Sequence, residues 1–161
     1  MKLTRRFLLK LLAAVGVMLA PGVTLAEEKE QYTRTVSLRA LGPFVDTLIP
    51  EDTTPGATQL GVDVVLISQA GTDSNMAMLL VAGCDWLDRT AREQGVDEFA
   101  ELNLTARETV VRAAEQSPPQ ALPRAFFDTI RRHAFRHYYA QPASWRGLGF
   151  SGPPQPRGSP S

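Results

Sequence analysis

The chain has 161 residues, enough for one domain, and its 17 basic side chains balance its 17 acidic ones. Four of the basic residues and no acidic residue lie within residues 1–26, so the remainder carries 13 basic against 17 acidic side chains. A mildly acidic body argues against a nucleic-acid partner. The single cysteine, Cys84, excludes an internal disulfide and a cysteine-based metal cluster, and its apolar neighbours predict that it is a small buried side chain.

Residues 1–26 are typical of an export signal. A basic start is followed by an apolar run over residues 11–20 and then by a proline and a glycine. Short side chains at Thr24 and Ala26 predict cleavage after Ala26. The apolar run is shorter than the roughly 20 residues that span a bilayer, which disfavours a retained anchor.

The segment TRRFLLK within this region resembles a twin-arginine signal, although Leu8 stands where phenylalanine is usual. The matching positions are Thr4, Arg5, Arg6, Leu9 and Lys10. The alternative is an ordinary secretory signal that contains two arginines. The twin-arginine pathway exports folded proteins, commonly with cofactors already bound, yet we find no cofactor-binding motif further along the chain.

Apolar spacing predicts helices in the first half of the mature chain. A polar lead, residues 27–35, precedes a helical domain over residues 36–140. Leu41, Phe44, Val45 and Leu48 share one helix face, and Pro50 stops that helix. A short apolar run over 62–70 could open a second helix, and three- and four-residue spacing predicts a third from Ser74 to Gln94, which a glycine at position 95 ends.

The segment between the first two helices, residues 51–62, is rich in acids, threonine, proline and glycine, and we interpret it as a structured turn. Its adjacent carboxylates, Glu51 and Asp52, suggest either turn formation and helix capping or a metal or acid–base pair. Turn formation is the simpler interpretation.

The second half of the domain is helical as well. A connector over 96–102 carries Phe99 as a core residue, and Thr105 and Glu108 form a predicted capping box for a helix over 106–115. A final helix begins at residue 120 or 122 and ends at Tyr139. Because no segment alternates with period two, we predict an all-α domain of about four to five helices.

The best candidate for chemistry is the pair His133 and His137, which lie four residues apart on one helix face and could bind zinc or copper. A catalytic site needs a third ligand, and nearby arginines disfavour a cation. We therefore expect these histidines to pack or to form hydrogen bonds. A free-standing periplasmic metal-binding protein or small enzyme that uses them remains the alternative function.

The C-terminal tail, residues 141–161, is rich in glycine, proline and aromatic residues, and we expect it to be extended. Tyrosine and tryptophan are common at binding hot spots, and each buried aromatic removes about 150–250 Å² from water. The tail therefore either packs against the chain's own helices or holds a partner protein.

Three segments together resemble the gluconate 2-dehydrogenase subunit 3 family, the small subunit of membrane-bound, flavin-dependent sugar and polyol dehydrogenases. They are the twin-arginine start, the segment LIPEDTTPGATQLGV over residues 48–62, and the ending YYAQPASWRGLGF with GPPQP over 138–156. The resemblance implies an accessory chain without catalytic, cofactor or metal residues. It also implies a large partner subunit that carries FAD, a multihaem cytochrome c subunit, and the twin-arginine translocase.

In such complexes the small subunit escorts the folded large subunit to the periplasm, where the assembly is membrane-associated. This role explains a folded-export signal on a chain without a cofactor site, and it favours the tail as a partner-binding arm. The expected docking residues are Tyr138, Tyr139, Trp145, Leu148, Phe150, Pro153 and Pro154.

Overall fold

The structure, a computed structural model, describes the backbone of residues 38–148 and the side chains of residues 38–145. This part is helical and contains no strand, which confirms the all-α prediction. Its α-helices are α3 (Leu41–Leu48), α4 (Val62–Ala70), α5 (Ser74–Glu93), α6 (Leu104–Gln116) and α7 (Leu122–Tyr139). Three short 3₁₀ helices, η1 (Thr58–Leu60), η2 (Phe99–Glu101) and η3 (Pro142–Leu148), lie between or after them.

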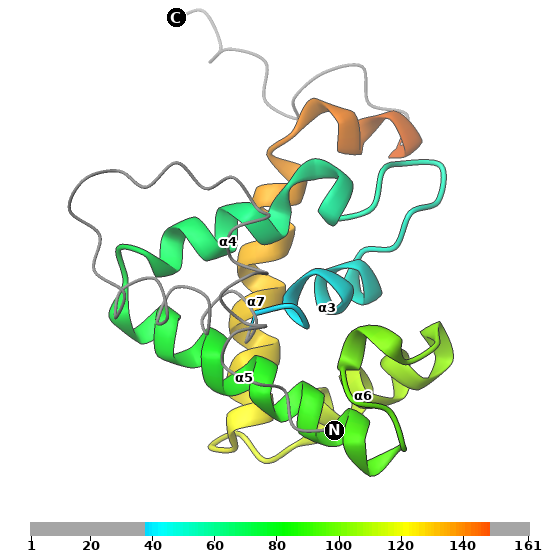
Figure 1. The fold of residues 1–161 in the computed structure, drawn as a ribbon. Coiled ribbons are helices and arrows are strands. Elements are labelled where there is room, and N and C mark those ends of the chain that lie inside the picture. Colours follow the sequence, from blue (N-terminus) through cyan, green and yellow to red (C-terminus); the bar gives the residue numbers. More distant parts are fainter. Residues whose placement is uncertain (1–37, 149–161) are drawn as a thin grey trace, which may run out of the picture. The chain divides into compact units, whose positions relative to one another are not determined.

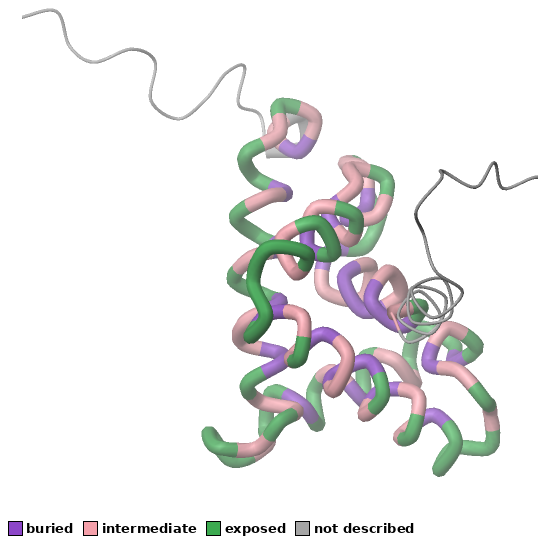
Figure 2. The backbone as a smooth tube through the Cα atoms, turned by 60° about the vertical axis from the view of Figure 1, so that its left-hand side comes forward, coloured by how far each residue is buried: buried purple, intermediate pink, exposed green. Residues whose placement is uncertain are grey.

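Helix α7 is the central element of this domain. It packs against α3, α4, α5 and α6, so residues from each part of the described chain reach it (Figure 1). Buried positions follow the helix sides that face one another (Figure 2). None of the helices in residues 38–148 is long and apolar enough to cross a membrane.

Most helix ends lie where the sequence predicts them. Pro43 is accommodated in the first turn of α3, and Pro50 follows its C-cap residue, Ile49. The side chain of Asp73 accepts hydrogen bonds from two backbone amides at the start of α5. Gly95 follows the end of α5 with a φ of 89°, a conformation that glycine adopts without strain.

The predicted capping box at Thr105 is wrong. Helix α6 begins at Leu104, and the side chain of Asn103 caps it by accepting a hydrogen bond from the amide of Ala106 at 2.9 Å. Asparagine is at least as good an N-cap as threonine, and here it lies two residues earlier. The Thr105 backbone carbonyl instead accepts a hydrogen bond from the Thr109 hydroxyl within the helix.

Aromatic rings from three elements form the centre of the core. Phe44 of α3 lies 6.5 Å from the ring of Phe99 and 4.9 Å from the ring of Phe126, and all three are fully buried. The Phe126 ring lies so close to Gly83 of α5 that a Cβ atom there would be 2.0 Å from it. Glycine at this position therefore allows α5 and α7 to pack closely.

Cys84, next to Gly83, is fully buried and unpaired, as the sequence predicts. Burial, together with the nearby Asp88 carboxylate, raises the pKa of its thiol to about 12. The thiol therefore stays protonated at neutral pH and acts as a small apolar side chain.

The chain after α7 differs from the predicted extended course. Residues 142–148 form the 3₁₀ helix η3, in which Ser144 is buried and its amide and hydroxyl both donate to the carbonyl of Gln141. The indole of Trp145 donates to the carbonyl of Tyr139 at 2.8 Å. The indole bond uses a carbonyl at the end of α7, which has no partner within that helix.

Candidate functional site

Two segments that carry the family resemblance, residues 48–62 and the stretch that begins at Tyr138, lie against each other. The hydroxyl of Tyr138 is 2.9 Å from Oγ1 of Thr54 and 2.7 Å from the carbonyl oxygen of Pro55. The side chain of Gln141 donates to the carbonyl of Leu60 at 2.9 Å. Hydrogen bonds thus join the loop after α3 to residues at and just after the end of α7, which lie about 80 residues later in the chain.

The direction of the Tyr138 bond follows from the protons available. Thr54 donates its only hydroxyl proton to Oδ1 of Asp52 at 2.9 Å, and its amide donates to the same oxygen at 2.8 Å. A carbonyl oxygen can only accept, so Tyr138 must be the donor to Pro55 and Thr54. Tyr138 is only 2% exposed, and its hydroxyl provides the hydrogen-bond donor for the carbonyl of Pro55.

The acidic residues of the loop are used in building it. Hydrogen bonds from the backbone and side chain of Thr54 lower the pKa of Asp52, and Glu51 accepts a bond from Gln59 at 2.9 Å. These contacts favour the interpretation of both carboxylates as turn-forming groups. Asp46 of α3, which the sequence analysis missed, accepts bonds from the amide and hydroxyl of Thr58 at 2.8 and 2.7 Å.

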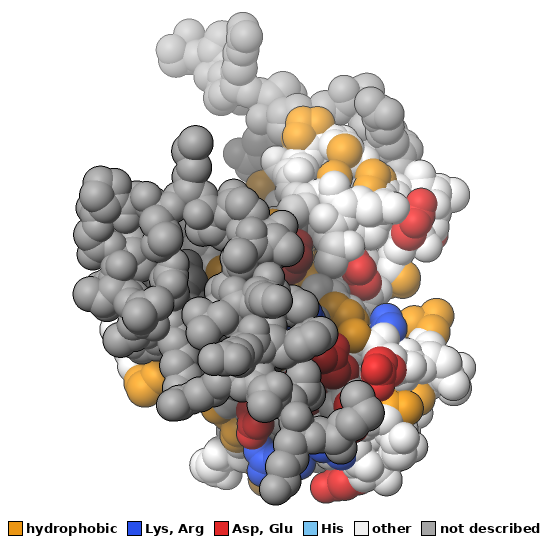
Figure 3. Space-filling model, viewed as in Figure 1, with side chains coloured by type: hydrophobic (Ala, Val, Ile, Leu, Met, Phe, Trp, Pro, Cys, Tyr) orange, Lys and Arg blue, Asp and Glu red, His pale blue; other side chains and the backbone are white. Residues whose placement is uncertain are grey.

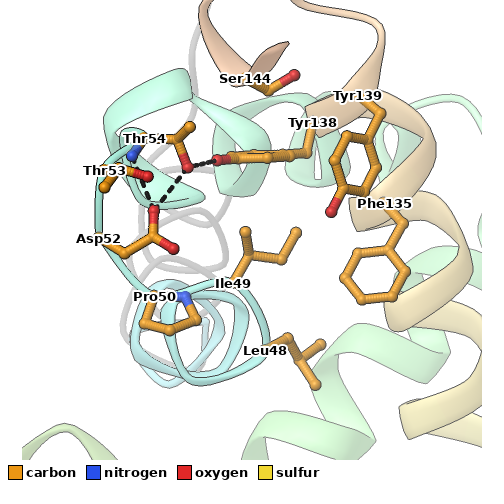
Figure 4. Close-up of a pocket in the computed structure, with 10 residues that line it drawn as sticks. All are labelled: Leu48, Ile49, Pro50, Asp52, Thr53, Thr54, Phe135, Tyr138, Tyr139 and Ser144. Carbon is orange, nitrogen blue, oxygen red and sulfur yellow. Dashed lines mark hydrogen bonds between the residues drawn. The ribbon is translucent and has the colours of Figure 1, made fainter. Parts of the chain in front are cut away.

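A pocket of about 270 Å³ opens where the loop meets α7 (Figure 4). Its lining residues come from the end of α3 and the following loop, from the last turns of α7, and from η3. They are Leu48, Ile49, Pro50, Asp52, Thr53, Thr54, Phe135, Tyr138, Tyr139 and Ser144. In Figure 4, Leu48 and Ile49 lie on one side of the space, and Phe135 and Tyr139 lie on the other.

The residues predicted to dock a partner occupy different environments. Tyr138 is buried within the chain, Trp145 is partly buried, and Tyr139 is 48% exposed. Phe135, which the sequence analysis did not select, is 37% exposed, and its ring centre is 6.0 Å from that of Tyr139. Its position four residues before Tyr139 on one helix could have identified it.

Several predicted residues cannot be placed from this structure. Leu148 ends η3, but its side chain is not described. The docking residues Phe150, Pro153 and Pro154, the signal residues Arg5, Arg6, Leu9 and Lys10, and the cleavage residue Ala26 lie outside the described residues. Their roles remain predictions.

His133 and His137 share one partner, Gln69 of α4. The Gln69 side-chain nitrogen lies 2.7 Å from Nε2 of His137, and its oxygen lies 3.2 Å from Nδ1 of His133. With this amide orientation, His137 accepts a bond and His133 donates one. Burial lowers the pKa of His133, and the charges of Arg132, His137 and Arg136 lower it further.

The metal-site alternative lacks a third ligand in the part of the chain that the structure describes. No group of three or more histidine, cysteine, aspartate or glutamate side chains there could hold an ion. The side chain of Gln69 already forms a hydrogen bond with one ring nitrogen of each histidine. This contact supports the hydrogen-bonding interpretation of the pair.

Carboxylates and small apolar patches lie side by side on the described surface in Figure 3. The large apolar side chains exposed in residues 38–145 include Val64 and Ile67 on α4 and Met78 on α5. The pocket differs from these sites because its exposed rings adjoin a concave surface. It is therefore the best candidate in the described region for receiving part of another molecule.

A family model described as gluconate 2-dehydrogenase subunit 3 matches residues 37–152, most of the chain. The match includes the loop over 48–62, all five described α-helices and η3. No curated protein and no solved structure matches the chain.

Proposed function

This chain belongs to the gluconate 2-dehydrogenase subunit 3 family, and on that premise we propose that it is the non-catalytic small subunit of a periplasmic, FAD-dependent dehydrogenase complex. Its catalytic partner belongs to the glucose–methanol–choline class and oxidises a sugar, polyol or gluconate. A cytochrome c subunit accepts the electrons. The chain stabilises the catalytic subunit and carries it, folded, through the twin-arginine translocase.

The family match over residues 37–152 is the observation that carries this proposal. The signal supports the export step, because Arg5 and Arg6 occupy the twin-arginine positions of TRRFLLK. A chain that uses a folded-export signal without a cofactor motif of its own is suited to carrying a partner. The arrangement at the end of α7 supports docking, because Phe135 and Tyr139 leave apolar ring surface exposed beside a pocket.

We infer that the C-terminal region has two parts with different roles. Residues up to Trp145 are bound to the chain's own body through Gln141, Ser144 and the indole. We assign residues 149–161, with Phe150, Pro153 and Pro154, to the partner-binding arm. A chain truncated after residue 148 should therefore keep its thermal stability but lose affinity for the catalytic subunit.

The export step is tested by changing Arg5 and Arg6 to lysine in cells that also produce the proposed flavoprotein partner. The change keeps the positive charge but removes the pattern that the translocase reads. We expect dehydrogenase activity to fall in the periplasm while the flavoprotein accumulates in the cytoplasm. Lys2→Arg is the matched control, since it changes a basic residue outside the pattern, and undiminished periplasmic activity in the double variant contradicts the escort role.

A further inference from the structure

The pocket at the end of α7 carries negative charge in its described lining. Asp52 is the single charged side chain among its ten lining residues. Three aromatic rings lie with it, those of Tyr138 and Tyr139 being 5.1 Å apart at an interplanar angle of 89°. Aromatic rings can bind a cation on their faces, which carry partial negative charge.

The carboxylate of Asp52 is held in place while part of it stays available. Oδ1 accepts both bonds from Thr54, and Figure 4 shows the other oxygen directed toward the space beside Ile49. The bonds from Thr54 lower the pKa of Asp52, so the group is ionised at neutral pH. Among the side chains that the structure describes, residues 38–145, no lysine or arginine lines the pocket.

The remaining lining suits an aliphatic stem. Leu48, Ile49 and Pro50 form an apolar side opposite Phe135 and Tyr139 (Figure 4). A volume of about 270 Å³ accommodates one long side chain and is too small for a folded element such as a helix. An occupant with an apolar stem and a cationic head matches the shape and charge of the pocket.

We propose that this pocket receives one arginine side chain of the FAD-dependent catalytic subunit, with its guanidinium at the Asp52 carboxylate and its stem along the apolar and aromatic lining; this inference rests on the proposed function. Arginine fits better than lysine, because its planar head presents several donors at once. A neutral aromatic side chain would leave Asp52 without a counter-charge when the interface excludes water. The pocket is thus the place where the small subunit selects its partner.

The first test measures the affinity of the purified mature chain for the proposed flavoprotein partner. Asp52→Asn removes the charge but keeps an oxygen that can accept both bonds from Thr54, so the loop should stay folded. We expect this variant to weaken binding by about tenfold or more, the scale of a charge pair that is desolvated on binding. Asp85→Asn is the matched control, since Asp85 is an exposed carboxylate on α5 paired only with Arg89 in the described region.

The two proposals fail in different ways. If the unchanged chain does not bind the flavoprotein, both the proposed function and the pocket assignment are overturned. If it binds and Asp52→Asn binds equally well, the pocket assignment is overturned while the proposed function stands. Equal losses for Asp52→Asn and Asp85→Asn also overturn the assignment, because they indicate a general effect of net charge.

A photocrosslinking residue in place of Tyr139 identifies the occupant in the intact complex. We expect a crosslink to a peptide of the flavoprotein that contains arginine, and we expect replacement of that arginine by alanine to weaken binding as Asp52→Asn does. A crosslink to residues 149–161 of the same chain, to a second copy of the chain, or to a flavoprotein peptide without arginine overturns the proposal.

Discussion

Gly83 allows α5 and α7 to approach closely, and adding a single methyl group there tests the packing between these helices. In Gly83→Ala the new Cβ would lie 2.0 Å from Cδ2, 2.4 Å from Cγ and 2.5 Å from Cε2 of Phe126. Carbon atoms pack at about 3.5–4.0 Å, so the ring would have to move by roughly 1.5 Å. The ring is fully buried and is 4.9 Å from the ring centre of Phe44, which limits that movement.

Two opposing effects set the free energy of unfolding of this variant. Alanine is better than glycine inside a helix by about 1 kcal/mol, whereas overpacking a tight core costs about 1–3 kcal/mol and occasionally more. Because three ring atoms lie well inside contact distance, we expect the cost at the upper end of that range. The net loss is then about 2 kcal/mol, which lowers Tm by roughly 10 °C for a domain of this size.

Thermal unfolding followed by circular dichroism measures this loss directly. Gly42→Ala is the control, because its Cβ would meet the nearest atom beyond its chain neighbours, Cγ2 of Thr58, at an ordinary 3.5 Å. Its cost is limited to the helical conformation that a residue before proline disfavours, so the control should lose less stability than Gly83→Ala. A Tm for Gly83→Ala equal to or above that of the control refutes the reasoning, and partial recovery on adding Phe126→Leu supports it.

Three further changes test the capping, the clamp at the loop and the histidine pair. Asn103→Ala should cost about 1 kcal/mol of stability in urea unfolding by removing the α6 cap, while Thr105→Ala should cost much less, and equal losses contradict the cap assignment. Tyr138→Phe should cost about 1–2 kcal/mol in the same assay, because the carbonyl of Pro55 loses its donor; an unchanged midpoint excludes the clamp. In the folded chain the pKa of His133 lies below its ordinary value of 6.5, so the unfolded chain binds a proton at this residue more readily. The free energy of unfolding therefore falls as the pH drops from about 7.5 to about 5.5. His133→Gln should reduce that fall, and an identical pH dependence argues against a buried neutral histidine.

Local sequence signals were sufficient to predict the helices. Pro50 acts through the backbone restriction that proline imposes, and Gly95 acts through the conformational freedom of glycine, so their effects on α3 and α5 do not depend on the rest of the fold. The start of α6 was harder, because Asn103 and Thr105 are both good caps and the chain can use only one. Helix η3 was missed because its first turn depends on the buried hydroxyl of Ser144 rather than on helix propensity.

The candidate site depends on contacts between distant residues, which a single sequence does not reveal. Gln69 forms hydrogen bonds with His133 and His137, which lie more than 60 residues later in the chain. The four-residue spacing of the two histidines did not indicate an amide partner. Tyr138 was selected as a large aromatic residue, but its burial follows from the position of the loop carbonyls against α7. The family resemblance identified the two segments, and the structure adds that they meet.

Co-purification tests the central claim, that this chain is an accessory subunit of a flavin-dependent dehydrogenase, most directly. The tagged chain is produced together with the proposed flavoprotein partner and isolated from the periplasm. The flavin absorbance and dehydrogenase activity of the eluate are then measured. The account predicts that the flavoprotein elutes with the chain and that both flavin and activity are present. Elution of the chain alone, with the active flavoprotein elsewhere, would contradict it.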